Sequence, residues 1–194
     1  MTVTPYRRGA TIHGPDDPAQ HWYRLVSGVA RKCALLPDGR RQIVDFLLPG
    51  DFFGLIVRHE HRFAVEAIAK DTVVARYPRR RVEALADSDP EVGRLIREVA
   101  FETISRAQAR TLILGRTTAA EKVGSFLLEM AERWAGATVD AFVLPMSRYD
   151  IADYLALAAE TVSRALTDLK QRGAIALVRA HRVRIVDRDT LTLD

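Results

Sequence analysis

The chain has 194 residues, of which 48% are hydrophobic and 28% are charged, and its formal net charge is +4 at pH 7. This length is enough for one large domain or two small domains with hydrophobic cores. No run of about 18 apolar residues occurs, so we expect no membrane-spanning helix. The mildly basic balance permits a nucleic-acid partner without requiring one.

The N-terminus and the cysteine content predict a cytoplasmic protein. Residues 1–9 lack the apolar segment that a secretory signal needs. Cys33 is the only cysteine, which excludes an internal disulfide framework and fits a reducing compartment.

Residues 1–80 have the pattern of a small all-β domain. Turn signals rich in Gly, Pro and Asp recur at short intervals and separate β-rich runs. Residues 29–36 and 40–48 flank Pro-Asp-Gly, which predicts a hairpin. Residues 63–68 and 72–77 are expected to form later strands.

Residues 81–115 are expected to form a long dimerisation helix. Asp89-Pro90 opens a segment in which apolar residues recur at spacings of three and four. These residues are Val92, Leu95, Ile96, Val99, Thr103, Ile104, Ala107, Leu112, Ile113 and Leu114. The simplest way to bury so long a stripe is against the same helix of a second copy. The alternative is one helix packed along its own β-domain. Because Arg106 and Arg110 interrupt the stripe, the sequence does not define which residues form the dimer seam.

Residues 116–194 have the element order of a winged helix-turn-helix. Thr118-x-x-Glu121 is a capping box that starts a helix ending near residues 134–136, and residues 142–145 form a short extended piece. Ser147-x-x-Asp150 is a second capping box.

The helix that follows Ser147 breaks near Leu157. Residues 159–172 form the next helix, which Gly173 stops. Residues 175–178 and 182–186 alternate as a hairpin that turns at Ala180-His181. Helix, helix, helix and hairpin is the order of a winged helix-turn-helix.

The face of the helix at residues 159–172 predicts DNA reading. Apolar residues repeat at four and three, so Glu160, Ser163 and Arg164 lie on the outer side. An arginine donates to guanine O6 and N7, and a glutamate accepts from cytosine N4. The alternative is an ordinary helical hairpin with a polar outer face.

Four further residues are predicted to contact the DNA backbone. They are Ser147, Arg148, Thr161 and, in the hairpin, Arg182. Such contacts position a helix on the duplex without specifying sequence, and the basic residues add salt-dependent affinity.

The phrases at residues 114–123 and 160–164, with the β-domain phrases at 23–28 and 48–54, resemble the cyclic-AMP receptor protein/FNR superfamily of bacterial transcription regulators. The resemblance covers nearly the whole chain. It implies an α+β fold with an N-terminal antiparallel β-roll, a long dimerisation helix and a C-terminal winged helix-turn-helix. It also implies a homodimer that binds double-stranded DNA.

Ala159 and Ser163 narrow the resemblance to the FNR type, because the cyclic-AMP receptor type has Arg and Gly there. Glu-x-x-Ser-Arg implies a TTGAT-like half-site in an inverted repeat. The phrases around residues 144–155 and 160–166 resemble the FixK group. That resemblance implies activation of microaerobic, respiratory or nitrogen-fixation genes through RNA polymerase.

The β-domain departs from the family's ligand-binding members. Leu55 follows Phe53-Gly54 where cyclic-nucleotide binders have Glu, and Arg62 is followed by Phe63 rather than Ser or Thr. We therefore expect no cyclic-nucleotide binding. A four-cysteine iron–sulfur cluster is impossible within one chain that has only Cys33.

We expect no cofactor, no metal and no enzymatic activity. The pair in His59-Glu60-His61 is expected to be solvated, His13 is expected to be isolated, and Cys33 is expected to be a small apolar filler. One alternative is a regulator of the same family that depends on a small molecule, haem or redox signal. Another is a cupin-like metal enzyme, which needs ligands on one face, whereas adjacent strand residues point to opposite faces.

Overall fold

A computed structural model describes residues 1–56, 58–135, 141–179 and 182–192. The chain divides into two compact units, Met1–Gln108 and Ala109–Asp194. Each unit is described by itself. None of the helices in these described ranges combines the length and apolarity needed to cross a membrane.

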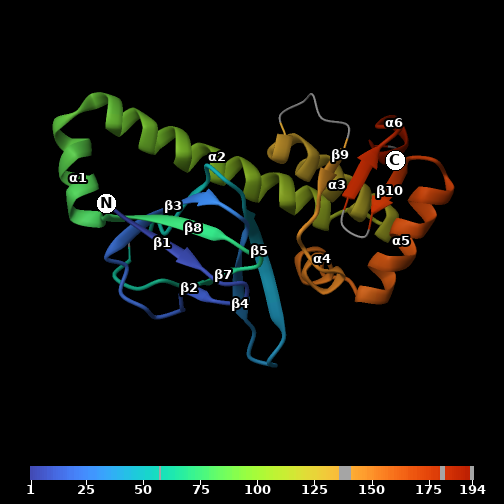
Figure 1. The fold of residues 1–194 in the computed structure, drawn as a ribbon, viewed down its shortest axis with the longest axis horizontal. Helices are drawn as coiled ribbons and strands as arrows, with labels where there is room; N and C mark the ends of the chain where they lie inside the picture. The colour runs from blue at the N-terminus through green and yellow to red at the C-terminus, as the bar shows by residue number, and fades with distance from the viewer. Residues whose placement is uncertain (57, 136–140, 180–181, 193–194) are drawn as a thin grey trace. The chain divides into compact units, whose positions relative to one another are not determined.

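The first unit contains two four-stranded antiparallel sheets (Figure 1), and the sequence predicts the all-β character of residues 1–80 but not this strand order. One sheet has the order β1-β8-β3-β6 and the other β2-β7-β4-β5. The strands are β1 (Thr2–Tyr6), β2 (Thr11–His13), β3 (His21–Ser27), β4 (Ala30–Leu35), β5 (Arg41–Leu47), β6 (Phe52–Phe53), β7 (Ala64–Ala67) and β8 (Thr72–Pro78).

Alternating side chains build the core of this unit. On β3, Tyr23 and Leu25 are buried while Arg24 and Val26 are exposed, which is the period of two that a half-buried strand shows. The buried β3 residues join one hydrophobic cluster with residues of neighbouring strands. That cluster also contains Ala30, Leu47, Phe53, Val65 and Val74.

The hairpin predicted around Pro-Asp-Gly is confirmed. Strands β4 and β5 pair in antiparallel fashion, from Ala30 opposite Leu47 to Leu35 opposite Arg41. In the turn, the backbone N–H of Arg40 donates to the Asp38 carboxylate at 3.0 Å. An aspartate at that position satisfies a turn N–H that no strand neighbour reaches.

A separate helix, α1 (Arg79–Ser88), precedes the long helix and was not predicted from the sequence. It ends at Asp89, whose backbone is extended, as is favoured for a residue before proline. The Asp89 carboxylate accepts a hydrogen bond from Glu91 N at 2.9 Å. Helix α2 (Pro90–Leu114) begins there, as Asp89-Pro90 predicts, so the segment 81–115 expected as one helix is divided between α1 and α2.

The apolar stripe on α2 divides into two faces. Val92, Ile96 and Val99 are partly buried and line an apolar depression of about 260 Å³ together with residues of α1, β3, β6 and β8. Farther along, Ile104 and Leu112 of the stripe are 52% and 73% exposed, and Phe101, which the predicted stripe did not include, is 66% exposed. The stripe predicted as one seam is therefore partly an intramolecular contact and partly an open apolar face.

Arg106 interrupts the stripe because its side chain points toward two carboxylates of the β-roll in its own unit. Its Nη1 donates to Asp51 Oδ1 at 3.0 Å, and its Nε lies 3.7 Å from Asp45 Oδ2. All three side chains are largely buried. A buried guanidinium between two carboxylates is a satisfied charge within this unit.

The second unit has the predicted winged helix-turn-helix order. Its elements are α3 (Ala119–Ala135), β9 (Ala141–Val143), α4 (Arg148–Leu155), α5 (Ala159–Gln171), β10 (Ile175–Arg179), β11 (Arg182–Ile185) and α6 (Asp189–Thr192). Strand β9 adds a third strand to the wing, in the order β10-β11-β9. The predicted turn at Ala180-His181 lies outside the described residues.

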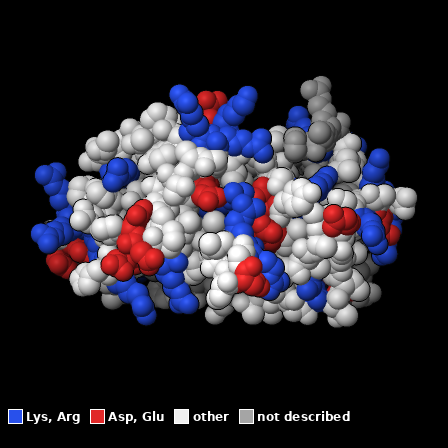
Figure 2. Space-filling model, turned by 90° about the horizontal axis from the view of Figure 1, so that it is seen from below, with Lys and Arg blue, Asp and Glu red and all other residues white. Residues whose placement is uncertain are grey.

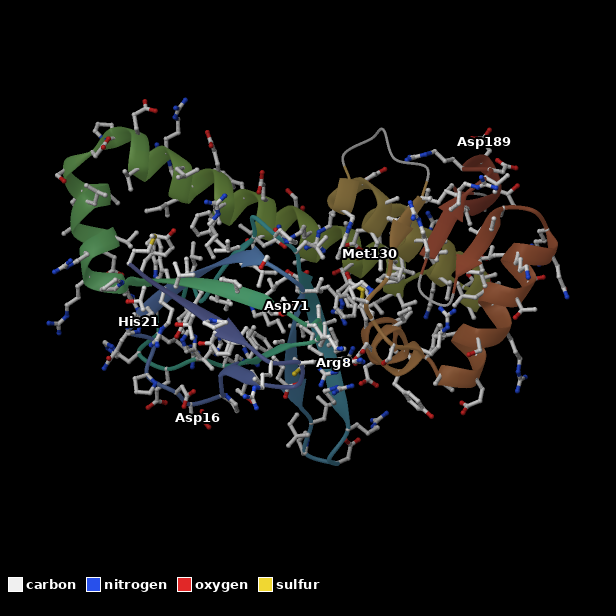
Figure 3. The ribbon with its side chains drawn as sticks, in the orientation of Figure 1. Arg8, Asp16, His21, Asp71, Met130 and Asp189 are labelled. Atoms are coloured by element: carbon white, nitrogen blue, oxygen red, sulfur yellow. The ribbon has the colours of Figure 1, made fainter. Side chains whose placement is uncertain are left out.

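The core of the second unit comes from the apolar faces of α3, α4 and α5. Phe126, Leu127 and Met130 of α3 are fully buried, and Met130 lies in the interior of the unit in Figure 3. Leu155 of α4 and Leu166 of α5 are buried with them. The capping box predicted at the start of α3 is confirmed, because Glu121 N donates to the Thr118 hydroxyl at 3.2 Å and Thr118 N donates to the Glu121 carboxylate at 3.3 Å.

Candidate DNA-binding interface

The capping box at Ser147 fixes where α4 begins. Asp150 N donates to the Ser147 hydroxyl at 3.1 Å, and Ser147 N donates to the Asp150 carboxylate at 2.9 Å. The Ser147 hydroxyl also donates to that carboxylate at 2.7 Å. The cap satisfies N–H groups that the first helical turn leaves free, so the predicted start of α4 is confirmed.

A tight turn separates α4 from α5. Ala156 adopts a left-handed conformation with φ 54°, and its N–H donates to Ala152 O. Leu157 N donates to the same carbonyl at 3.0 Å. Helix α5 begins at Ala159, so the predicted break between the two helices is confirmed.

Helix α5 has one buried face and one exposed face. Val162, Leu166 and Leu169 are buried, as their spacing predicts. Glu160, Ser163 and Arg164 are exposed on the outer face. The structure therefore brings the three candidate base-reading residues together on one face, and their contact with bases stays a prediction.

The Ser163 hydroxyl is oriented along the helix. It donates to Ala159 O at 3.0 Å, and one turn later the Thr167 hydroxyl donates to Ser163 O at 3.0 Å. A hydroxyl whose proton is used in this way still has lone pairs that accept hydrogen bonds. In this orientation Ser163 offers an acceptor to the outside.

Glu160 and Arg164 present their charged groups outward. Within the described part of the chain, neither forms an ion pair, although they stand at i,i+4. Asp168 and Arg172, farther along α5, do pair at 2.8 Å. Figure 2 shows basic and acidic side chains interspersed on the face in view, so charge there is not gathered into one patch.

The four residues predicted to contact the DNA backbone lie at element ends. Arg148 is the first residue of α4, Thr161 lies in the first turn of α5, and Arg182 is exposed at the start of β11. Partial burial lowers the pKa of Arg148 from its usual value, and an arginine stays charged at neutral pH. Ser147 is half-buried, and its hydroxyl and N–H both serve the cap.

Tyr149 is a further candidate that the sequence analysis did not include. It is 69% exposed beside Arg148 in the first turn of α4. A tyrosine hydroxyl is a common donor to phosphate oxygens. Its place directly after Ser-Arg at a capped helix start is the signal that could have identified it.

Gly54, Leu55 and Arg62 lie where the sequence departs from the pattern of cyclic-nucleotide binders, and the structure gives the surroundings of each. Gly54 has φ +79°, and a Cβ there would lie 2.7 Å from the Tyr23 ring. Leu55 lines the apolar depression beside α1 and α2. The Arg62 guanidinium lies 5.8 Å from the Phe63 ring centroid, within the range of a cation–π contact, and Arg62 is exposed.

The expectation that His61 is solvated and His13 isolated is wrong. Both are buried, and their ring centroids are 3.7 Å apart. His59 is exposed, so the His59-Glu60-His61 run divides between surface and interior. The searched, described residues contain no group of three or more His, Cys, Asp or Glu side chains that could hold a metal ion. Cys33 is buried in β4, as a small apolar filler would be.

Comparison with known proteins matches both units. Residues 3–89 match the cyclic nucleotide-binding domain, and residues 121–193 match the Crp-like helix-turn-helix domain. The chain is 45% identical over 194 residues to the nitrogen fixation regulation protein FixK of Azorhizobium caulinodans, covering 98% of this chain and 77% of that protein. This chain belongs to the FixK branch of the CRP/FNR superfamily.

A solved structure supports the same assignment. FixK2 from Bradyrhizobium japonicum matches with a TM-score of 0.90 and 44% identity, over 98% of this chain and 94% of that one. The FixK protein of Bradyrhizobium diazoefficiens is 43% identical over 89% of this chain and 73% of its own length. The predicted fold class is confirmed, and the FixK-like chain is a DNA-binding transcription regulator rather than an enzyme.

Proposed function

We propose that this FixK-like chain acts as a homodimer on an inverted repeat of TTGAT-type half-sites and needs no cyclic nucleotide to do so. The observation that carries the proposal is the division of α5 into two faces. Its inner face is buried in the second unit, while Glu160, Ser163 and Arg164 are exposed together. A helix held in this way can enter a major groove as a rigid reader.

The chemistry of the three side chains suits the single G·C pair of that half-site. The Arg164 guanidinium can donate two hydrogen bonds to guanine O6 and N7. The Glu160 carboxylate can accept from the N4 amino group of the paired cytosine. Ser163, whose own proton is donated along the helix, offers an acceptor to an adenine or cytosine amino group.

Around this reader, backbone contacts set the register. We assign them to Ser147, Arg148, Thr161 and Arg182, at the starts of α4, α5 and β11. The cationic pair among them, Arg148 and Arg182, supplies the salt-dependent part of the affinity.

The second copy is expected to pack against the exposed apolar face of α2. Phe101, Ile104 and Leu112 are each more than half exposed on this helix. Large apolar side chains on a long helix are typical of a helix–helix dimer. In this proposal, the chain has three parts. Residues 1–80 form the β-roll, residues 81–115 the dimerisation segment and residues 116–194 the DNA-binding part.

The physiological role follows from the relatives. One relative, which is 35% identical, is the transcriptional activator protein FnrL of Cereibacter sphaeroides, and FixK proteins are nitrogen fixation regulators by name. We propose that this chain activates microaerobic, respiratory or nitrogen-fixation genes in the cytoplasm, through RNA polymerase. Leu55, which has no carboxylate to accept from a ribose hydroxyl, and Phe63 after Arg62 favour activity without cyclic nucleotide.

The test is selection of bound duplexes from a random pool, using protein purified free of metal and nucleotide. Enrichment of two inverted TTGAT-type half-sites supports the proposal. Enrichment of a different motif refutes the half-site, and binding that appears only after a small molecule is added refutes effector independence. Isothermal titration showing tight cyclic-AMP binding would also refute it.

A further inference from the structure

Tyr154 is the point at which α2, α3 and α4 meet in the second unit. It lies in the last turn of α4 and is 1% exposed. Its hydroxyl donates to Glu129 Oε2 of α3 at 3.1 Å, and its backbone carbonyl accepts from Arg110 Nη2 of α2 at 3.1 Å. The Phe126 ring of α3 lies 5.6 Å from the Tyr154 ring. One buried side chain therefore contacts both neighbouring helices.

Arg110 holds Tyr154 at two points. Besides the hydrogen bond to the carbonyl, its guanidinium carbon lies 4.9 Å from the Tyr154 ring centroid. The carbonyls of a last helical turn have no partner within the helix, and a cation there also faces the negative end of the helix dipole. Arg110 thus serves as a C-terminal cap for α4 that is supplied by another helix.

The opposite side of Tyr154 is held by α3. Glu129, which accepts from the tyrosine hydroxyl, is also paired with Arg133 at 3.1 Å. Both charged side chains are largely buried. A carboxylate with this support keeps a fixed position, so α4 cannot shift on α3 without breaking a buried hydrogen bond.

The end of α2 thus has two opposed surfaces. Arg110 faces Tyr154, while Leu112, two residues later and about 200° around a helix of 3.6 residues per turn, is 73% exposed. Leu112 belongs to the face that the proposed dimer would cover. The same turn of α2 therefore bears the dimer on one side and the helix-turn-helix on the other.

We infer that Arg110 is a positioning residue that sets the spacing between the two half-sites the dimer accepts. The inference rests on the proposed dimeric DNA binding. In such a dimer, the separation of the two α5 helices depends on the angle at which α2 leaves α4 in each copy. Half-site spacing mirrors that separation. A two-point contact between Arg110 and Tyr154 restricts the angle, since it fixes both a distance and a ring orientation.

The consequence is a selective effect on spacing. Arg110 belongs to α2 and is not one of the base-reading residues of α5. Its loss therefore leaves the base-reading side chains in place. A looser joint lets the two reading helices accommodate a spacer that the rigid joint rejects. Discrimination between spacers therefore falls, whereas discrimination between bases at the G·C pair stays as it was.

The experiment measures dissociation constants for duplexes with the selected spacer and with spacers one base pair shorter and longer. Wild type is compared with Arg110→Met, Arg110→Lys and the matched control Arg80→Met, which removes an exposed arginine of α1. The spacer ratio is the dissociation constant for a wrong spacer divided by that for the selected spacer. For Arg110→Met, we expect this ratio to fall about threefold to tenfold, the range for one net hydrogen bond. Arg110→Lys is expected to lose part of the ratio, because an ammonium lacks the planar fork.

Two outcomes separate this inference from the proposed function. A wild type that shows no specific binding refutes the proposed function and the inference with it. A specific wild type, with both Arg110 variants retaining its full spacer ratio, overturns the inference alone, even if their affinity falls equally for all spacers. Circular dichroism checks folding, and if Arg110→Met does not fold, the ratio for Arg110→Lys decides.

Discussion

His13 and His61 stack face to face in the β-roll, with ring centroids 3.7 Å apart and an interplanar angle of 19°. Both are buried, and among the described residues the Nε2 atoms of both have no hydrogen-bond partner. Burial, followed by the charge of His61, lowers the pKa of His13 to about 4, and burial also lowers the pKa of His61. Two other charged groups act on both rings: Asp17 raises the pKa of each histidine, and Lys32 lowers it.

The stacked pair predicts a loss of stability in mild acid. The unfolded His13 titrates near 6.5 and the folded one near 4, so between these values the unfolded state binds the proton better. The contribution of neutral His13 to the free energy of unfolding is fully present above about pH 6.5. It is lost as the pH drops toward about 4, and the loss is about 3 kcal/mol at most. Urea unfolding across this range measures it. His13→Phe should flatten the curve, and a variant as steep as wild type would contradict the assignment.

Arg164→Ala is expected to weaken binding to the selected site by about tenfold to 100-fold, because a bidentate contact to guanine is worth about 1–3 kcal/mol. The same variant should lose discrimination against substitution of the G·C pair. Fluorescence anisotropy with matched duplexes measures both effects. Lys170→Ala, which removes another exposed cation of α5, is the control and should leave base discrimination intact. Equal discrimination by Arg164→Ala and wild type would show that Arg164 does not read bases.

Ile104→Glu is expected to separate the proposed dimer. It places a carboxylate in the middle of the exposed apolar face of α2, where the second copy would remove it from water. An unpaired buried charge costs about 3 kcal/mol or more, so the dimer dissociation constant should rise at least about 100-fold. Sedimentation velocity over a concentration series measures it. Thr103 lies about 100° around the helix from Ile104 and outside the face of Phe101, Ile104 and Leu112, so Thr103→Glu should have a smaller effect. Equal effects would place the seam elsewhere.

Ser147→Ala is expected to cost about 1 kcal/mol of stability, the usual value for a lost N-cap. The Tm of the second unit should fall by about 4–8 °C, the scaling for a domain of this size. Because the Ser147 hydroxyl and N–H both serve the cap, its DNA contact is predicted to depend on that cap. Ser147→Thr keeps both the capping acceptor and the hydroxyl that donates to Asp150, so it should retain the Tm and the DNA affinity. A Ser147→Ala protein that keeps the wild-type DNA affinity despite its lower Tm would argue against any phosphate contact at this position.

Arg148→Met is expected to change the salt dependence of DNA binding without changing its sequence preference. Loss of one phosphate contact reduces the slope of log K against log salt by about 0.9. Binding measured at several salt concentrations gives the slope. An unchanged slope would remove Arg148 from the backbone contacts and leave Tyr149 as the exposed candidate at this helix start.

The features that the sequence determined are those with local causes. Alternation places Tyr23 and Leu25 of β3 inside, because successive strand residues point to opposite faces. The Ser147–Asp150 capping box is complete within four residues. The buried face of α5 follows from its own periodicity, and the outward direction of Glu160 and Arg164 follows with it.

The features that only the tertiary structure decided have distant partners. In the sequence, Arg106 and Arg110 only interrupt an apolar stripe. In the structure they bind Asp51 and Tyr154, which lie 55 and 44 residues away along the chain. The sequence pattern places His61 in an exposed loop, whereas in the structure His13 of β2 stacks against it. Periodicity reports which side of an element is apolar or polar. It does not report what covers that side, because this depends on how the chain brings remote segments together.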